Sequence, residues 1–321
     1  YFESKLNLLP TILSRKNAIL LTDEHLFSAH PKQFKGWSTI VLKAGEEQKV
    51  QATVDSVIQQ LINKGADRTT TLVGVGGGVV TDLTGYIASI YMRGIPFGFL
   101  PTSLLAMVDA SIGGKNGIDV GVYKNMVGCI RQPQFILYDA CFLSTLPEKE
   151  WINGFAEIIK HAAIKDAPLF RQLEANSLPS YQKKKSLLSA LVQRNAILKT
   201  KVVQLDEFEQ ADRKLLNFGH TLGHALEKQH DLAHGSAVAI GMVAAAKLSG
   251  FFSSFKDTDR LTQLLDRYGL PVQLAYNKDQ VFTVLKSDKK KEDDFINYVL
   301  LRKIGQGFIQ KISLEQLYNY L

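Results

Sequence analysis

The stretch Thr71-Leu-Val-Gly-Val-Gly-Gly-Gly-Val-Val-Thr-Asp82 decides the fold of the N-terminal half of the chain. Its first residues, 71–75, are predominantly apolar and predict a short strand that runs directly into three glycines. Glycine permits a tight turn and a close approach of the backbone to a phosphate group, and the start of a following helix attracts anions. The stretch therefore predicts a strand–turn–helix unit, which is either a nucleotide cradle or only a tight turn.

This stretch departs from the dinucleotide-binding fingerprint GxGxxG. Val79 occupies the position of the third glycine. The fingerprint also expects an acidic residue about 20 residues further on, and the chain has none at that spacing. We interpret the stretch as a nucleotide cradle of a non-standard kind, with the tight structural turn as the alternative.

Strand-like and helix-like segments alternate around this stretch, and this alternation predicts a parallel sheet covered by helices. After Pro147 the segments become long and helical, so we predict an α/β domain over 1–147 and a mainly helical domain over 148–321. The predicted strands are 18–22, 39–42 and 71–75, with a single further strand at 296–301, and the predicted helices are 50–63, 148–165, 186–208, 213–229 and 235–249.

The composition is that of an ordinary globular protein. The chain has 321 residues, of which 45% are hydrophobic and 21% charged, and this excludes disordered, collagenous and coiled-coil classes. The uncharged stretch 94–108 is too short to span a membrane and contains two prolines, so we expect no transmembrane topology. Only Cys129 and Cys141 are present and no CxxC motif occurs, which predicts a reducing, cytoplasmic location.

The net charge of +7 lies almost entirely in the second half of the chain. Residues 1–150 hold 14 basic against 13 acidic side chains, and residues 151–321 hold 24 against 18. Basic stretches interleaved with aromatic residues are absent from the sequence, so we expect no nucleic-acid partner. The short runs 183–185 and 289–291 are typical of solvated helix ends, while the overall excess also fits a pocket for a small anion.

Three of the seven histidines cluster in the sequence. His220 and His224 are four residues apart on one predicted helix face, and His234 follows 14 residues after His220. The spacing suits a divalent metal held by nitrogen and one carboxylate, although the glutamate of an HExxH motif is absent. The alternative is that two of these histidines are helix-capping or core residues.

Two further patterns carry polar chemistry. Glu157 and Lys160 are three residues apart on an apolar helix, which indicates either a surface ion pair or a metal-binding carboxylate beside a substrate-binding cation. Four segments dense in Gly, hydroxyl groups, Lys and Asn follow the first glycine run, and such loops supply donors to anionic and polyol groups. These segments are 91–94, 101–103, 108–116 and 121–125.

Taken together, these residues resemble the 3-dehydroquinate synthase family over nearly the whole chain, from about residue 22 to about residue 305. The resemblance rests on seven motifs in the family's order: the glycine run, VDASIGGK (108–115), YKNM (123–126), STLP (144–147), NGFAEIIKH (153–161), NFGHTLGHA (217–225) and AHG (233–235). It implies a Rossmann-like α/β N-terminal domain that binds NAD and an all-α C-terminal domain that binds zinc.

The resemblance also implies roles for individual residues. Glu157, His220 and His234 would hold Zn²⁺, or Co²⁺ in its place, while His224, Glu209 and Lys160 would be catalytic. The positions matching NAD contacts are Asp23, Glu46, Lys49, Gly77, Gly78, Val79, Asp82, Thr102, Ser103, Lys124, Thr145 and Asn153. The positions matching substrate contacts are Arg93, Asp109, Lys115, Asn125, Lys160, Lys199, Arg213, Asn217, Lys289 and Lys290. Arg93 would reach the substrate of a neighbouring subunit in a homodimer.

Two positions depart from the family pattern. Thr81 replaces the usual Gly before Asp82 and could crowd a pyrophosphate group. Ser103 replaces the usual Thr but keeps the hydroxyl group.

The implied reaction converts 3-deoxy-D-arabino-heptulosonate 7-phosphate to 3-dehydroquinate and phosphate. It proceeds through transient oxidation by NAD, phosphate elimination, re-reduction and intramolecular aldol closure. One rival function is that of a related cyclase that acts on sedoheptulose 7-phosphate, which lacks the carboxylate that Arg213 and Asn217 would bind. The sequence is also compatible with a metal-dependent polyol dehydrogenase and with a catalytically silent NAD-binding protein.

Overall fold

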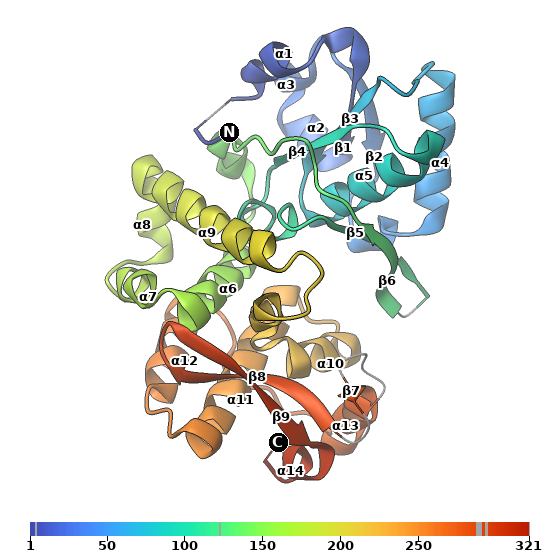
Figure 1. Cartoon of the computed structure of the whole chain (residues 1–321). Coiled ribbons are helices and arrows are strands. Elements are labelled where there is room, and N and C mark those ends of the chain that lie inside the picture. Colours follow the sequence, from blue (N-terminus) through green and yellow to red (C-terminus); the bar gives the residue numbers. More distant parts are fainter. Residues whose placement is uncertain (4, 122, 287–290, 293–294, 321) are drawn as a thin grey trace. The chain divides into compact units, whose positions relative to one another are not determined.

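The computed structural model describes residues 1–320 except 4, 122, 287–290 and 293–294, and leaves undescribed the side chains of residues 228, 286, 291 and 292. The chain divides into two compact units (Figure 1). The first unit comprises residues 1–150 and 189–200, and the second comprises 151–188 and 201–321. The expected domain boundary after residue 147 stays a prediction. Residues 189–200, which belong to a later helix, group with the first unit.

The first unit is built on a parallel sheet, which confirms the predicted α/β class. Its strand order is β2–β1–β3–β4, and every neighbouring pair is parallel. A two-stranded antiparallel hairpin, β5–β6, follows. The strands are β1 (Ala18–Asp23), β2 (Ser38–Leu42), β3 (Thr71–Gly76), β4 (Phe97–Pro101), β5 (Lys115–Val120) and β6 (Tyr123–Ile130).

Helices and helical turns connect these strands. The α-helices are α1 (Leu9–Ile12), α2 (Glu24–Ala29), α3 (Pro31–Phe34), α4 (Gln51–Asn63) and α5 (Gly78–Ile90). A π-helical turn covers Ala106–Ala110, and 3-10 turns cover Leu6–Leu8, Arg15–Asn17, Glu46–Gln48, Tyr91–Arg93 and Ala140–Thr145.

The sheet buries apolar side chains on both faces. Ile19 and Leu21 of β1 join one core cluster, whereas Ala18 and Leu20 join another, because successive residues of a strand point to opposite faces. The first cluster includes Val54 of α4 and residues of α5. Strand β3 is buried along its whole length, and such burial is typical of central strands in parallel sheets.

The second unit is mainly helical. Its α-helices, some of which continue into the first unit, are α6 (Glu148–Lys165), α7 (Ala167–Glu174), α8 (Leu178–Lys183), α9 (Lys185–Leu205), α10 (His220–His230), α11 (His234–Ser253), α12 (Thr258–Arg267), α13 (Lys278–Lys286) and α14 (Leu314–Tyr320). A 3-10 turn covers Asp212–Asn217.

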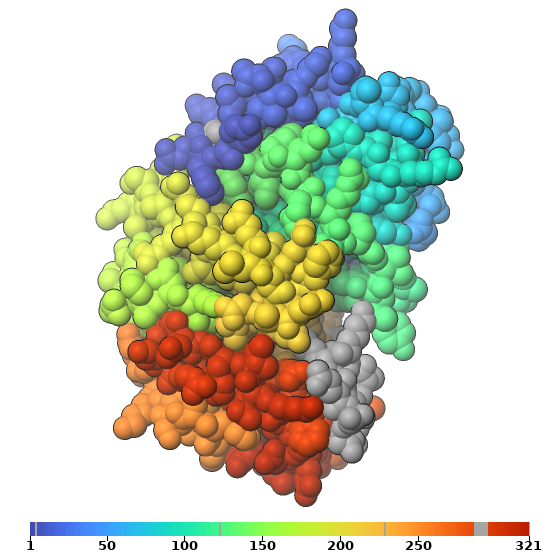
Figure 2. Space-filling model, viewed as in Figure 1, coloured from blue at the N-terminus to red at the C-terminus, as the bar shows by residue number. Residues whose placement is uncertain are grey.

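One prediction about this unit was wrong, and a second, the strand over 296–301, was confirmed but incomplete. The helix expected over 213–229 is interrupted, because Gly219 adopts a left-handed conformation (φ 79°) between the 3-10 turn and α10. The single strand expected over 296–301 belongs to a three-stranded antiparallel sheet of β7 (Lys291–Glu292), β8 (Phe295–Lys303) and β9 (Gln306–Ser313). The last two strands lie at the surface of the unit, where Figure 2 shows them in red.

Helix α11 is the buried core helix of the second unit. Among the described residues it alone is long and apolar enough to cross a membrane by length and composition, a window overlooked in the sequence. However, 67% of that window is buried inside the structure, as in the core helix of a water-soluble protein. Ser249 Oγ of α11 accepts a hydrogen bond from the Leu301 N–H at 2.9 Å, and this bond fastens the sheet to the helix.

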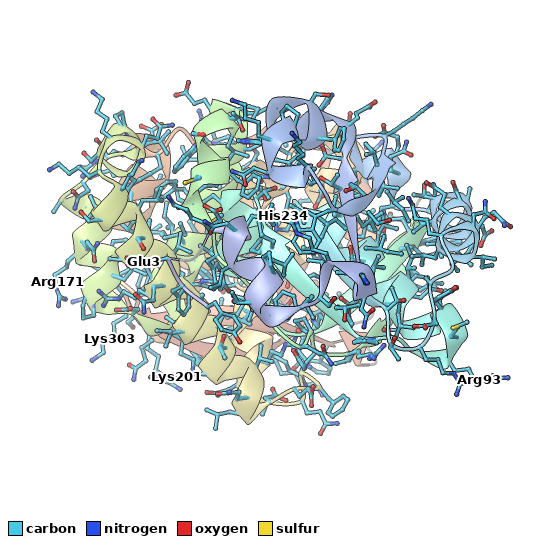
Figure 3. All side chains as sticks on the ribbon, turned by 90° about the horizontal axis from the view of Figure 1, so that it is seen from above. Glu3, Arg93, Arg171, Lys201, His234 and Lys303 are labelled. Atoms are coloured by element: carbon cyan, nitrogen blue, oxygen red, sulfur yellow. The ribbon has the colours of Figure 1, made fainter. Side chains whose placement is uncertain are left out.

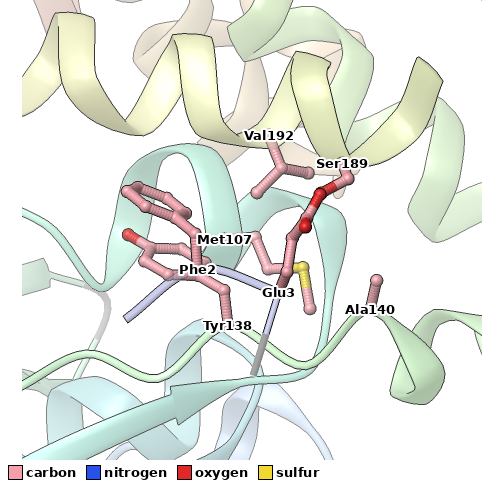
Figure 4. Close-up of a pocket in the computed structure, with 7 residues that line it drawn as sticks. All are labelled: Phe2, Glu3, Met107, Tyr138, Ala140, Ser189 and Val192. Atoms are coloured by element: carbon pink, nitrogen blue, oxygen red, sulfur yellow. The ribbon is translucent and has the colours of Figure 1, made fainter. Parts of the chain in front are cut away.

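A small pocket in the first unit is lined by none of the predicted site residues (Figure 4). Phe2 and Tyr138 stack in it with their ring centroids 4.7 Å apart. Met107 contributes from the π-helical turn that also carries Asp109. The lining is mostly apolar and comprises Phe2, Glu3, Met107, Tyr138, Ala140, Ser189 and Val192.

Candidate active site

A carboxylate and two imidazoles converge in the second unit. The Nε2 atom of His234 lies 3.0 Å from Glu157 Oε1, and the Nε2 atom of His220 lies 3.5 Å from the same oxygen. One ligand atom from each residue falls within 4.8 Å of the other two. Two imidazole nitrogens and one carboxylate oxygen form the ligand set of a zinc site with an open position. The arrangement therefore fits a divalent metal.

Local structure aims these side chains. Gly219 is the N-cap of α10, so His220 is the first residue of that helix, and His234 is the first residue of α11. The His220 Nδ1 atom contacts the Phe218 carbonyl at 3.1 Å, and the His234 Nδ1 atom lies 3.6 Å from Glu227 Oε2. Partners of this kind at Nδ1 orient metal-binding imidazoles and leave Nε2 for the ion.

The surroundings shift the pKa values of His220 and His234 in opposite directions. Burial and the nearby Lys160 ammonium lower the pKa of His220 well below its usual range. Burial also opposes protonation of His234, but hydrogen bonds to Glu157 and Glu227 outweigh it and raise the pKa of His234 to about 9. Glu227 was not singled out in the sequence, although it lies on α10, three residues after His224.

Glu157 and Lys160 form a buried ion pair, not a surface one. Glu157 is 0% exposed and Lys160 is 2% exposed, and the Lys160 ammonium contacts Glu157 Oε2. The structure thus excludes the surface alternative. The His224 ring lies beside the group, with its centroid 5.1 Å from that of His220, but it is outside the three-ligand set.

A second group of predicted residues gathers around the loop 206–217 of the second unit. The Arg213 guanidinium is buried and donates to the Glu207 carbonyl. The Asn217 amide donates to the Glu209 carboxylate. The predicted carboxylate-binding pair and the predicted catalytic acid thus lie in one segment.

The predicted strand–turn–helix unit is present in the first unit, where β3 runs through Gly77 into α5. Gly77 is the N-cap of α5. A Cβ atom at Gly77 would lie 3.5 Å from Ser103 Oγ, so the glycine run and the 101–103 loop are neighbours. The Thr81 hydroxyl donates to the Gly78 carbonyl at 2.9 Å, and its side chain is buried.

Lys49 links helix α5, which follows the glycine run, to the β5–β6 hairpin. Its ammonium contacts Asp82 Oδ2 at 2.6 Å and Asn125 Oδ1 at 2.6 Å. Burial lowers the pKa of Lys49, but Asp82 and Glu46 outweigh this effect, so the amine is held protonated with its pKa above the usual range. Three residues that the resemblance assigned separately to cofactor and substrate are thus in contact.

The remaining predicted residues are more scattered. In the first unit, Lys199 pairs with Asp109 at 2.6 Å, and the hydroxyl of Thr145 bonds His30. In the second unit, Asn153 accepts a bond from the Gly235 N–H next to His234. Thr102 donates its N–H to the Gly76 carbonyl. Asp23 caps α2, Lys115 begins β5 and Lys124 lies on β6, while Lys289 and Lys290 fall outside the described residues.

Arg93 stands apart on an exposed turn and extends away from the body of its unit (Figure 3). Both Arg93 and the preceding Met92 adopt positive φ angles, 68° and 50°. Such angles are uncommon outside glycine and mark a backbone that its surroundings hold in place.

Comparison with known proteins agrees with this arrangement. The profile of the 3-dehydroquinate synthase N-terminal domain matches residues 39–153, and that of the C-terminal domain matches 154–291. A 3-dehydroquinate synthase from Pelobacter propionicus is 42% identical over 284 residues, which are 87% of this chain and 79% of that protein. The corresponding protein of Thermodesulfovibrio yellowstonii is 38% identical over 311 residues, 95% of this chain and 86% of that protein.

Solved structures share the fold. A 2-epi-5-epi-valiolone synthase from Streptomyces hygroscopicus, with NAD⁺ and Zn²⁺ bound, has a TM-score of 0.90 at 27% identity and covers 99% of this chain and 94% of its own. A 2-deoxy-scyllo-inosose synthase with NAD⁺ and Co²⁺ has a TM-score of 0.86 at 25% identity, with the same coverage. A probable glycerol dehydrogenase from Sinorhizobium meliloti, at 13% identity and a TM-score of 0.67, shares the fold alone.

The fold and the converging ligands define an enzyme of the sugar-phosphate cyclase class, in which an α/β unit accompanies a helical metal-binding unit. The two matched profiles and the relatives of about 40% identity then settle the family. The chain belongs to the 3-dehydroquinate synthase family, whose enzymes act in the shikimate pathway.

Proposed function

We propose that this chain converts 3-deoxy-D-arabino-heptulosonate 7-phosphate to 3-dehydroquinate and phosphate, with NAD and a divalent metal as cofactors. The convergence of Glu157, His220 and His234 beside the buried Lys160 carries this proposal. The relatives of about 40% identity support it, because the proteins of Pelobacter propionicus and Thermodesulfovibrio yellowstonii are both named 3-dehydroquinate synthases.

Glu157, His220 and His234 would hold Zn²⁺, and Co²⁺ would suit the same nitrogen and oxygen ligands. The nucleotide would lie on the cradle formed by the glycine run and the first turn of α5, whose amides attract phosphate groups. When bound, the nicotinamide supplies a hydride acceptor, and the metal supplies a Lewis acid that lowers the pKa of a substrate hydroxyl.

Anion recognition falls to the basic side chains. The planar guanidinium of Arg213 suits a carboxylate, and the Asn217 amide lies in the same segment. Lys160 is nearly buried and would present a fixed positive charge to the substrate beside the metal ligands. In the first unit, Lys199, Asp109 and Asn125 would add further substrate contacts, since the ion pair and the Asn125–Lys49 bond fix their positions.

Proton transfer would use His224 and Glu209. His224 lies next to His220 and outside the three-ligand set, so we assign it to proton exchange and not to metal binding. Glu209 is held by the Asn217 amide, which orients its carboxylate. These two groups would move protons during elimination and ring closure.

We also infer a homodimer in which Arg93 reaches the substrate phosphate of the partner subunit. Strand β6 presents exposed apolar side chains, including Tyr123 (58%), Met126 (48%) and Ile130 (40%). The Arg131 guanidinium after β6 donates to the Ala88 carbonyl at 2.9 Å and so joins this strand to the segment that leads to Arg93. An exposed apolar edge strand is a template for pairing with another chain.

A cytoplasmic location is part of the same proposal. Neither Cys129 nor Cys141 forms a disulfide in the structure, which suits a reducing compartment.

Phosphate release tests the function directly. The protein, zinc, a catalytic amount of NAD and the heptulosonate phosphate should together release one phosphate per substrate, with NADH absorbance staying flat. Turnover of sedoheptulose 7-phosphate in preference to the carboxylate substrate would instead assign the related cyclase. Steady accumulation of NADH would assign a polyol dehydrogenase.

A further inference from the structure

One carboxylate organises the loop between α9 and α10. Asp206 directly follows the last residue of α9, and its Oδ1 atom accepts a hydrogen bond from the Gln210 N–H at 2.8 Å. Its Oδ2 atom accepts from the Ala211 N–H at 2.7 Å and from the Arg213 N–H at 3.0 Å. Three backbone donors from one loop thus meet at a single side chain.

The same loop holds a backbone conformation that requires support. Glu209 has a φ angle of 59°, in the left-handed region that residues other than glycine rarely adopt. Such a residue persists only where neighbouring contacts fix it. The bonds of Asp206 to Gln210 and Ala211 directly follow Glu209 and supply that support.

The loop carries two residues of the proposed chemistry. Glu209 accepts a hydrogen bond from Asn217, and the Arg213 guanidinium, 2% exposed, donates to the Glu207 carbonyl. Both side chains depend on where the loop backbone lies. A displacement of about 1 Å is enough to reduce catalysis by a hundredfold when it moves a positioned group.

We propose that Asp206 is a positioning residue, which sets the loop backbone so that Glu209 and Arg213 face the phosphorylated keto acid. The inference rests on the proposed function for its substrate, but not for its geometry. Burial raises the pKa of Asp206, but the three backbone hydrogen bonds outweigh this effect and hold the pKa below its usual range. The carboxylate therefore stays ionised at neutral pH and keeps all three bonds.

Asp206→Asn tests the inference with almost no change in size. The asparagine keeps one acceptor oxygen and replaces the other with an NH₂ group, which cannot accept the bonds. Hydrogen exchange should show at least about tenfold lower protection in a peptide covering residues 207–214, and no change in α11. The kcat/KM value should fall by about ten- to a hundredfold, through both a higher KM and a lower kcat. Zinc content and NAD binding should be unchanged.

Asp212→Asn is the matched control. Asp212 lies in the same loop but is exposed, and its carboxylate pairs with Lys165 at 2.6 Å. This variant should keep exchange rates and kinetic constants within about twofold, since exposed ion pairs contribute little.

A double variant, Asp206→Asn with Arg213→Lys, separates positioning from a general loss of stability. If Asp206 acts through Arg213, the combined loss should be much smaller than the product of the two single losses. Multiplicative losses, unchanged exchange in 207–214, or a lower melting temperature with unchanged kinetic constants would each overturn the inference. The exchange measurement uses no substrate. A wild-type protein that releases no phosphate would therefore refute the proposed function, and exchange would still decide the role of Asp206.

Discussion

Replacing Gly241 with alanine should separate the two helices that carry the proposed imidazole ligands. Gly241 lies in the middle of α11, where it packs directly against the backbone at the start of α10. An ideal Cβ atom at this position would lie 1.9 Å from the Gly219 carbonyl oxygen and 3.0 Å from the Gly223 nitrogen. Because the contacting atoms belong to the backbone, no side-chain rotation can relieve the overlap.

The size of the effect follows from this overlap. The two helices must move apart by about 1 Å before the added methyl group reaches an acceptable separation, and overpacking of this kind costs about 3 kcal/mol. For a unit of this size that loss lowers the melting temperature by roughly 6–12 °C. Gly219 immediately precedes His220, so the movement carries that ligand away from His234. Functional groups tolerate displacements of only about 0.5 Å, so zinc affinity should fall by at least about tenfold.

Two measurements test this reasoning. Thermal unfolding with and without zinc gives the loss of stability, and competition with a chelator gives zinc affinity. Gly250→Ala is the control, because it lies on the same helix and its Cβ atom would lie 3.7 Å from its nearest neighbour, the Phe255 carbonyl oxygen. The control should be neutral or stabilising by up to about 1 kcal/mol. The reasoning is refuted if Gly241→Ala melts and binds zinc as the wild-type protein does.

Four further outcomes are expected. His220→Ala and His234→Ala should lose zinc and all turnover, whereas His224→Ala should keep zinc and lose only rate; metal analysis showing the reverse would disprove the ligand assignment. His234 without metal has its pKa raised to about 9, so zinc must displace a proton from it, and apparent zinc affinity should rise about tenfold per pH unit between pH 6.5 and about 9. In the metal-free protein the stabilisation from that proton is complete below about pH 6.5 and is lost as the pH rises through about 9. Zinc affinity that does not change with pH over this range would contradict the first statement, and unfolding of the zinc-free protein that does not change with pH would contradict the second. Arg213→Lys should lower kcat/KM by about ten- to a hundredfold with zinc and NAD binding unchanged, because lysine keeps the charge but loses the planar fork; a lower melting temperature with unchanged kinetic constants would make Arg213 structural.

Local patterns in the sequence were sufficient for much of the fold. The apolar run into three glycines predicted β3 and the start of α5, and the predicted helix over 148–165 has the same bounds as α6. Proline at residue 147 and acidic residues in the first turn are signals that act within one turn of helix. The order of motifs was also enough to identify the family, since it needs no three-dimensional information.

Other features of the fold depended on contacts between distant segments. The sheet β7–β9 was missed, although strand 296–301 was found, because a strand acquires its partners only when the chain brings them together. The interruption at Gly219 was missed because the helical pattern continues across it. Its left-handed conformation fits the close approach of α11, which no spacing in the sequence reports.

The candidate site also has features that the sequence predicted and features that depended on tertiary contacts. Spacing placed His220 and His224 on one face of a helix, but spacing alone could not say which of them faces a metal. The structure favours His220, because its Nε2 atom lies 3.5 Å from Glu157 Oε1, whereas His224 is outside the group of converging ligand atoms. Burial likewise decided that Glu157 and Lys160 form an interior pair, and packing alone brought Glu227 to His234 and three backbone N–H groups to Asp206. Residue types and short spacings are properties of the sequence, whereas distances between remote side chains and their exclusion from water arise only when the helices pack.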